Sequence, residues 1–171
     1  MSTIGVVASA TGGVEQLRES LIAPLLDRGH QVALTLTPTA AEWIASAERS
    51  ELERITGLPV RSQPRRPGEP RPHPPIDVLV AAPASANTVA KLALGIGDNQ
   101  ALSVLSEGLG STPMVVFPRV NAAHARHPAW AGHLETLRRA SVALIEWGPR
   151  AADGRNLPWD RILGAVDGLS S

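Results

Sequence analysis

Hydrophobic residues along this chain fall into short unbroken runs that are separated by stretches of helical spacing. Ile4–Ala8 and Val32–Leu36 are nearly continuous runs of apolar and small residues, a pattern typical of strands that are buried on both faces of a sheet. We expect about six strands in total. The further candidates are residues 77–82, 114–117 and 142–146 and a short stretch at 59–61.

Helical spacing fills the intervals between these runs. Leu17, Leu21 and Leu25 recur at every fourth residue, and Gly29 follows where a helix over 14–28 would end. This alternation predicts an α/β protein with a doubly wound parallel sheet, Rossmann-like or flavodoxin-like, in a single domain over residues 1–171. The other expected helices cover residues 40–56, 86–94, 99–107, 128–140 and 158–169.

One segment of this domain departs from both patterns. Residues 64–75 hold six prolines in twelve positions. Proline lacks the backbone N–H that a sheet interior needs, so we expect an extended, proline-rich loop here.

Composition and charge exclude several classes of function. Sixteen basic residues balance sixteen acidic ones, so nothing favours binding to nucleic acid or to an anionic membrane. The chain has no cysteine, which excludes a disulfide framework and a thiolate metal site, and we expect no metal. No apolar stretch approaches the roughly 20 residues that span a bilayer, and the start of the chain lacks a signal-peptide pattern. We therefore expect a cytoplasmic protein.

Small or polar residues follow four of the predicted strands. Ligands of doubly wound folds bind beyond the carboxyl ends of the strands, and free N–H groups at helix starts bind anions, so these positions predict a phosphate-bearing ligand. An alternative interpretation is that the same side chains only cap helices. Neither GxGxxG nor a P-loop motif is present. The candidate residues are Ser9 and Thr11, then Thr37 and Thr39, then Ser85, Ala86, Asn87 and Thr88, and finally Arg119 and Asn121.

Two motifs make the sequence resemble a known family. Pro83–Thr88 reads PASANT and is followed by the GIGDN of Gly95–Asn99; both resemble the homo-oligomeric flavin-containing cysteine decarboxylases. These include phosphopantothenoylcysteine decarboxylase and the peptidyl-cysteine decarboxylases of lantibiotic biosynthesis. Pro118–Ala125 matches the family's P-x-M-N-x-x-M-W at the proline and at Asn121, but not at the methionines or the tryptophan. Taken as a whole, the sequence resembles small single-domain flavoproteins of actinobacterial type.

The resemblance implies an FMN cofactor bound between the subunits of a trimer, with trimers often assembled into a dodecamer. Ser9, Thr11 and Thr39 would lie at the FMN phosphate, and Thr37 in the same turn as Thr39. The stretch 85–88, from Ser85 through Ala86 and Asn87 to Thr88, would meet the flavin ring and its ribityl chain.

The family reaction is an oxidative decarboxylation of a thiol-containing small molecule or of a peptide that ends in cysteine. Flavin takes a hydride from the carbon that bears sulfur, and carbon dioxide then leaves. A histidine acts as base, and the asparagine equivalent to Asn121 binds the substrate carboxylate. Fourteen residues before Pro83 this chain has Glu69 at the place of that histidine, and His73 lies four positions later. Both are candidate bases.

The resemblance also implies neighbours for the substrate. Arg119 and His124 flank Asn121 and would lie near the substrate. A substrate clamp would correspond to Gly148–Leu157, in which Arg150 or Arg155 could hold an anion; a solvated loop is the alternative.

The absence of cysteine separates this chain from phosphopantothenoylcysteine decarboxylase, which needs a cysteine acid to reduce its product. Without that group, decarboxylation would release an enethiol-type product, so a role in coenzyme A synthesis is disfavoured. Two alternatives remain: a non-catalytic or regulatory flavin-binding protein, and a flavin prenyltransferase-like protein, whose branch reads differently at PASANT.

Overall fold

The centre of the computed structural model, which describes residues 1–147 and 156–170, is a parallel five-stranded sheet. The strand order is β2-β1-β3-β4-β5, which is the flavodoxin-like order of a doubly wound sheet. The predicted fold class is therefore confirmed. The strands are β1 (Thr3–Ala8), β2 (Gln31–Leu36), β3 (Val78–Ala84), β4 (Met114–Pro118) and β5 (Ala143–Leu144).

The expected short strand at 59–61 is wrong. Arg61 forms a single parallel bridge with Thr35 at the edge of the sheet, with hydrogen bonds from Arg61 N to Leu34 O and from Leu36 N to Arg61 O. Pro59 and Pro64 lie on either side of this bridge, and neither can donate a backbone hydrogen bond that would extend it. The sheet accordingly has five strands rather than about six.

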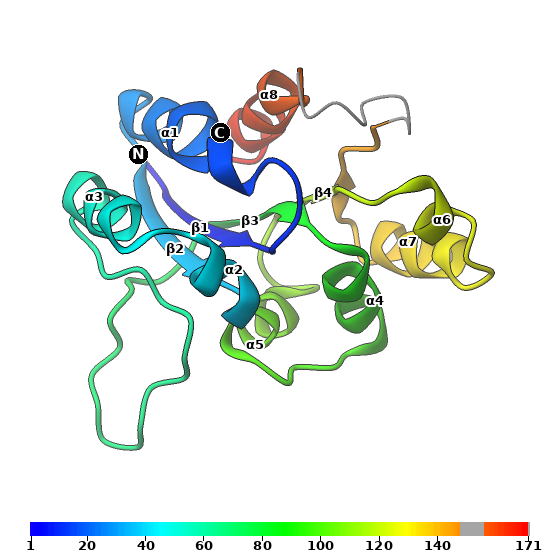
Figure 1. The fold of residues 1–171 in the computed structure, drawn as a ribbon, viewed down its shortest axis with the longest axis horizontal. Coiled ribbons are helices and arrows are strands. Elements are labelled where there is room, and N and C mark those ends of the chain that lie inside the picture. Colours follow the sequence, from blue (N-terminus) through cyan, green and yellow to red (C-terminus); the bar gives the residue numbers. More distant parts are fainter. Residues whose placement is uncertain (148–155, 171) are drawn as a thin grey trace.

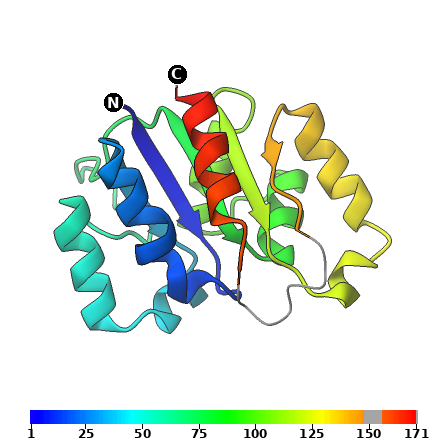
Figure 2. The ribbon, with the colours of Figure 1, turned by 90° about the horizontal axis from the view of Figure 1, so that it is seen from above.

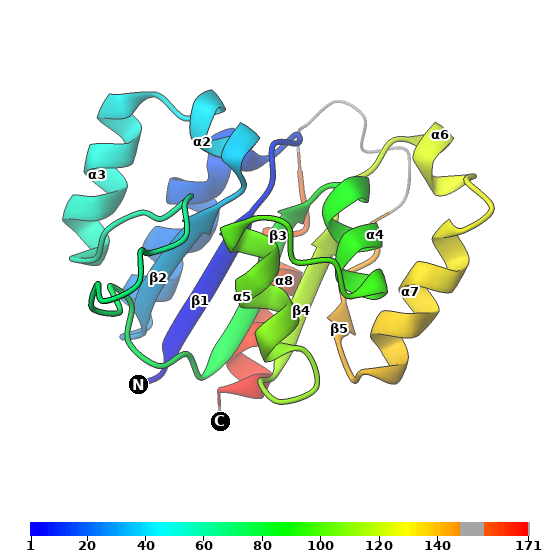
Figure 3. The same cartoon turned by 90° about the horizontal axis from the view of Figure 1, so that it is seen from below.

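Helices cover both faces of the sheet. Figure 2 shows α1 and α8 across one face, and Figure 3 shows α4, α5 and α7 across the other. In Figure 1 the proline-rich loop extends away from the body of the molecule between α3 and β3. The helices are η1 (Val14–Gln16, 3-10), η2 (Arg18–Ile22, π), α1 (Ala23–Asp27), α2 (Pro38–Trp43), α3 (Ser46–Thr56), α4 (Ala86–Leu94), α5 (Gln100–Gly108), α6 (Ala122–Ala125), α7 (Trp130–Arg139) and α8 (Trp159–Leu169).

The single helix expected over 40–56 is in fact two. Ile44 and Ala45 adopt extended backbone angles between α2 and α3. This break lets the side chain of Ile44 pack against the core, whereas the alanine-rich sequence around it gives no local signal for a turn. Among the helices of the described residues, none combines the length and the apolar character needed to cross a membrane.

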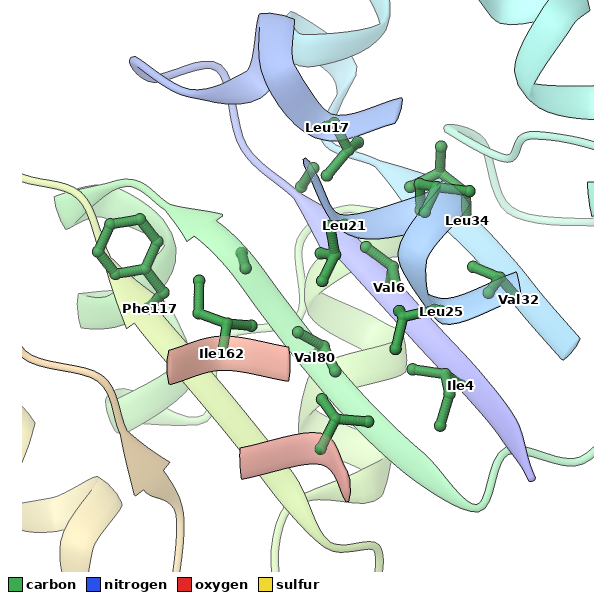
Figure 4. Close-up of a cluster of buried hydrophobic side chains, with 14 of the residues drawn as sticks. Ile4, Val6, Leu17, Leu21, Leu25, Val32, Leu34, Val80, Phe117 and Ile162 are labelled. Atoms are coloured by element: carbon green, nitrogen blue, oxygen red, sulfur yellow. The ribbon is translucent and has the colours of Figure 1, made fainter. Parts of the chain in front are cut away.

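The main core lies between the sheet and the pair α1 and α8. Leu17, Leu21 and Leu25 are fully or almost fully buried, and they point from the first helical segment toward Ile4 and Val6 of β1 (Figure 4). The helical spacing of these leucines therefore predicted the buried face correctly. On the opposite face β1 carries the much smaller Gly5.

Two glycines allow α5 to approach the sheet closely. A Cβ atom built on Gly108 would collide with Leu79 Cδ1, and one on Gly5 would lie 2.9 Å from Leu79 Cδ2. Leu79, which is buried on β3, thus occupies space that only glycine at both positions leaves open.

We expect Gly108→Ala to lower the free energy of unfolding by about 1–3 kcal/mol, because the added methyl group overpacks against Leu79. Gly164→Ala in α8 is the matched control, since nothing lies within 4 Å of its Cβ position, and it should raise stability by up to about 1 kcal/mol. Urea unfolding of both variants measures this, and a Gly108→Ala variant as stable as the unmodified protein would contradict the packing.

Candidate functional site

The turns that follow β1, β2, β3 and β4 are joined to one another at the carboxyl edge of the sheet. This edge includes the boundary between β1 and β3, where the chain switches the side toward which the sheet grows, and such switch points are the usual ligand sites of the fold. Three backbone hydrogen bonds link the turns: Thr37 N to Ala8 O (3.0 Å), Ser9 N to Pro83 O (2.9 Å) and Arg119 N to Ala84 O (2.8 Å).

The hydroxyl groups of Ser9 and Thr88 form a direct link across the switch point. Ser9 Oγ and Thr88 Oγ1 lie 2.8 Å apart, and the two residues are only 2% and 3% exposed. Ser85 Oγ donates to Thr88 Oγ1 at 3.2 Å and accepts from Thr88 N at 3.2 Å. The structure thus brings these three predicted residues together, although in this arrangement they bind one another.

Three of the predicted residues cap helices, as the alternative interpretation held. Thr37 accepts from Ala40 N at the start of α2, and Ser85 does the same for α4. Asn121 Oδ1 accepts from His124 N at 2.9 Å at the start of α6. Capping uses the oxygen of Asn121 and leaves the role of its amide nitrogen open, because a carboxamide carries both an acceptor and donors.

Exposed polar side chains surround these caps. Thr39 and Asn87 are each the second residue of their helix, and both are exposed; Ala86 beside Asn87 is partly buried. Asn121 and His124 are also exposed. These side chains are therefore accessible to a ligand at the strand ends.

The loop after β1 combines a bound carboxylate with a nearby cation. Gly13 N donates to Glu15 Oε2 at 2.9 Å, so the Glu15 carboxylate acts as an internal anion on this loop. The Arg119 guanidinium lies alongside, since a Cβ on Gly12 would be 3.7 Å from Arg119 Nε. Thr11 Oγ1 donates to Arg119 O at 3.1 Å. This donor set suits a phosphate group.

Glycine is required at the turn of this loop. Gly13 has a φ of 103°, a left-handed conformation that other residues rarely adopt. A Cβ there would also lie 2.5 Å from Leu157 Cδ1. Glycine at this position therefore allows the turn that directs the Gly13 N–H to the Glu15 carboxylate.

The two candidate bases lie elsewhere in the chain. His73 lines a cavity beside the proline-rich loop, together with Thr35 of β2 and Gln100 of α5, and its Nε2 donates to Pro59 O at 2.7 Å. Glu69 is exposed in the same loop and accepts from Arg66 N. Within the described part of the chain, neither side chain forms a hydrogen bond to a residue of the strand-end turns, and no residue of those turns lines the cavity of His73.

Burial lowers the pKa of His73; the hydrogen bond to Pro59 O opposes this in part, and the charge of Arg61 lowers the pKa by a smaller amount. The ring is therefore neutral at neutral pH. Because the Pro59 carbonyl can only accept, Nε2 carries the proton and Nδ1 is the basic atom. Such a ring can accept a proton from a substrate.

Two further expectations concern residues outside or around this site. Of the expected clamp, residues 148–155, with Arg150 and Arg155, lie outside the described part of the chain. Across 1–147 and 156–170, no group of three or more His, Asp or Glu side chains is placed to hold a metal ion.

Sequence reasoning missed the part played by Glu15. Its only signal was an acidic residue in the first turn of the helix that follows β1, which is a common and uninformative feature.

Comparison with known proteins identifies the family. The profile of the Flavoprotein family matches residues 1–170, so the chain belongs to this family, and the predicted flavoprotein resemblance is confirmed.

Curated relatives match this chain over only part of their own length. The bifunctional coenzyme A biosynthesis protein CoaBC of Escherichia coli K12 is 28% identical over 84% of this chain and 36% of its own length. The CoaBC of Thermococcus kodakarensis is 32% identical over 46% of this chain and 19% of its own. Phosphopantothenoylcysteine decarboxylase of Oryza sativa is 36% identical over 40% of this chain and 31% of its own length. The matched region thus spans about a third or less of the length of these relatives.

Solved structures share the fold over almost the whole chain. The peptidyl-cysteine decarboxylase EpiD has a TM-score of 0.75 at 19% identity, covering 96% of this chain and 97% of its own. The FMN-dependent cysteine decarboxylase TvaF of thioviridamide biosynthesis has a TM-score of 0.76 at 23% identity, and the match covers 100% of this chain and 99% of TvaF. A PPC decarboxylase variant in complex with pantothenoylaminoethenethiol has 0.72 at 21%, covering 99% of both chains.

We expect NMR titration of the His73 ring to give a pKa below the ordinary 6.5. Since the unfolded chain then binds this proton at higher pH than the folded chain, acidification through pH 6.5 should destabilise the fold. The variant His73→Gln can still donate to Pro59 O, identifies the resonance and should lose this part of the acid destabilisation. A pKa at or above 6.5 would contradict the burial argument.

Proposed function

We propose that the chain binds FMN at the joined strand-end turns and catalyses an oxidative decarboxylation of a thiol-containing, cysteine-like small molecule or peptide C-terminus. The observation that carries this proposal is the junction of four ligand-facing turns at the β1/β3 switch point, where flavodoxin-like folds bind FMN. Membership of the Flavoprotein family supports the cofactor. The likeness to cysteine decarboxylases supports the reaction.

The donor set of the loop after β1 supports a phosphate position there. The Gly13 N–H and the Arg119 guanidinium would hold the phosphate, which would replace the carboxylate of Glu15 on the N–H of Gly13. Thr11 would donate its hydroxyl proton to the phosphate in place of Arg119 O. Thr37 and Thr39 follow β2 at the same edge and would contribute from α2.

The start of α4 would face the ring and the ribityl chain. Asn87 offers an exposed amide beside Ala86, while Ser85 and Thr88 keep the turn in place through their hydrogen bonds. When bound there, FMN supplies a hydride acceptor.

Substrate binding falls to α6 and its flanks. Asn121 would orient the substrate carboxylate through its amide nitrogen while its oxygen continues to cap α6. His124, which follows on the same exposed turn, would lie near the substrate. Arg119 was expected there too, but its guanidinium lies beside Gly12 of the loop after β1 and would hold the phosphate instead.

Proton transfer requires a base that this chain does not bring to its own strand ends. A neutral His73 with a basic Nδ1 is chemically suited to the task, and Glu69 is the second candidate. A neighbouring copy of the chain would have to present either one, so the proposed active enzyme is a homo-oligomer, a trimer or a dodecamer built from trimers.

The separation of His73 from the strand ends also favours a second candidate function, a non-catalytic or regulatory flavin-binding protein. Because the chain has no cysteine, neither candidate includes reduction of a product by a thiol acid, and we propose a cytoplasmic role outside coenzyme A synthesis.

Asn121→Asp is the sharpest test of the reaction. Aspartate caps α6 as well as asparagine does, but it loses the amide donor and repels a substrate carboxylate. Carbon dioxide release from a peptide with C-terminal cysteine, followed by mass spectrometry, should fall at least about tenfold, with FMN content unchanged.

Asn99→Asp is the matched control, because Asn99 caps α5 through Leu102 N in the same way, and it should keep full activity. A yellow protein that releases no carbon dioxide from any thiol acid would establish the non-catalytic alternative. Equal activity of Asn121→Asp and the unmodified protein would remove Asn121 from substrate binding.

A further inference from the structure

A cavity of about 470 Å³ lies apart from the strand-end turns. It is bounded by the proline-rich loop and α5, and its floor is the middle of β1 and β2, at Gly5, Val7 and Ala33. Gly5, Val7 and Ala33 are themselves buried, and they alternate with Ile4, Val6, Val32 and Leu34, which pack into the core on the opposite face. The volume falls within the range of roughly 300–1,000 Å³ that is typical of small-molecule sites.

The loop side of the cavity is strongly cationic. Arg61, Arg65 and Arg71 all line it, beside His73, whereas among the described lining residues Glu107 of α5 is the single carboxylate. Within the described part of the chain, none of the three guanidinium groups forms an ion pair with a carboxylate. In a protein of zero formal net charge, this local excess of positive charge would attract an anion.

Hydrogen bonds hold two of these arginines without neutralising them. Arg61 Nη2 donates to Gln63 O at 3.0 Å, and Arg65 Nη1 donates to Glu69 O at 2.9 Å. Burial and the charge of Arg65 lower the pKa of Arg61, against an opposing effect of the Glu69 carboxylate. The cationic form of Arg61 therefore lacks part of the solvation that it would have in water. A negatively charged ligand would restore that stabilisation.

The remaining wall of the cavity is apolar. Pro72, Pro74, Ile76 and Leu79 contribute aliphatic surface, and Ser103 of α5 adds a hydroxyl. A cationic rim over an aliphatic interior suits a ligand with an apolar body and an anionic end.

We propose that this cavity is a second binding site, for a small organic anion whose apolar part lies against Pro72, Pro74 and Ile76 and whose carboxylate or phosphate is held by Arg61 and Arg71. Its lining comes from one chain and includes none of the strand-end residues proposed for FMN.

Isothermal titration calorimetry of the purified protein tests this proposal. The probes are 3-phenylpropionate, phenyl phosphate and the neutral 3-phenylpropanamide. At least one of the two anions should bind about tenfold or more tightly than the amide, and added salt should weaken its binding. The better of the two identifies the preferred anionic group.

Arg61→Met and Arg71→Met should each weaken anion binding by about tenfold or more, because each removes a charged donor but keeps an apolar chain. Arg139→Met is the control, since Arg139 is exposed on α7, where it pairs with Glu135, and it should bind the anion unchanged. Circular dichroism checks the fold, and flavin absorbance should be equal in all three variants. Equal affinity for the amide and the anions, no binding of either anion, or unchanged binding in both cavity variants would overturn the proposal.

Discussion

The pairing of β1 with β2 on one side and with β3 on the other is the constraint on which the structure depends. This pairing places the turn after β1 between the turns after β2 and β3, and it creates the switch point of the sheet. Backbone hydrogen bonds across the turns then fix their relative positions, and the buried pair Ser9 and Thr88 adds a side-chain link. Hydroxyl groups buried this deeply cost free energy unless they are hydrogen-bonded. The hydrogen bond between Ser9 and Thr88 therefore stabilises the shape of the site.

The same sheet creates two different surfaces. Bulky residues of β1 and β2 face α1 and α8 and form the core, while Gly5 and Ala33 lie on the other face, where Ile76 and Leu79 pack against Gly5 at the inner end of the cavity. Leu79 fills part of that face because Gly108 has no Cβ atom that would collide with it. The size of the residues at alternate positions of β1 and β2 therefore distinguishes the core face of the sheet from the face toward the cavity.

Much of the fold could be predicted from the sequence, because strands buried on both faces leave continuous apolar runs and helices leave a regular spacing. The helix 86–94 has the bounds that were expected, since Ser85 caps it and Gly95 ends it in a left-handed conformation. The break at Ile44 and the single bridge at Arg61 were not predictable, because tertiary packing and sheet-edge geometry cause them and neither leaves a local pattern.

The location of the site could be predicted from the sequence, but the contacts within it could not. Fold topology alone brings Ser9, Ser85 and Thr88 together, yet only the structure shows that these hydroxyls bind one another, that Glu15 occupies the Gly13 N–H and that Arg119 lies beside Gly12. The separation of His73 from these turns depends on the path of a proline-rich loop, which no periodicity encodes. A crystal structure of the protein grown with FMN tests the central claim most directly. The account predicts the phosphate at the loop after β1 beside Arg119 and the ring against residues 85–88; FMN found in the arginine-lined cavity, or not bound at all, would contradict it.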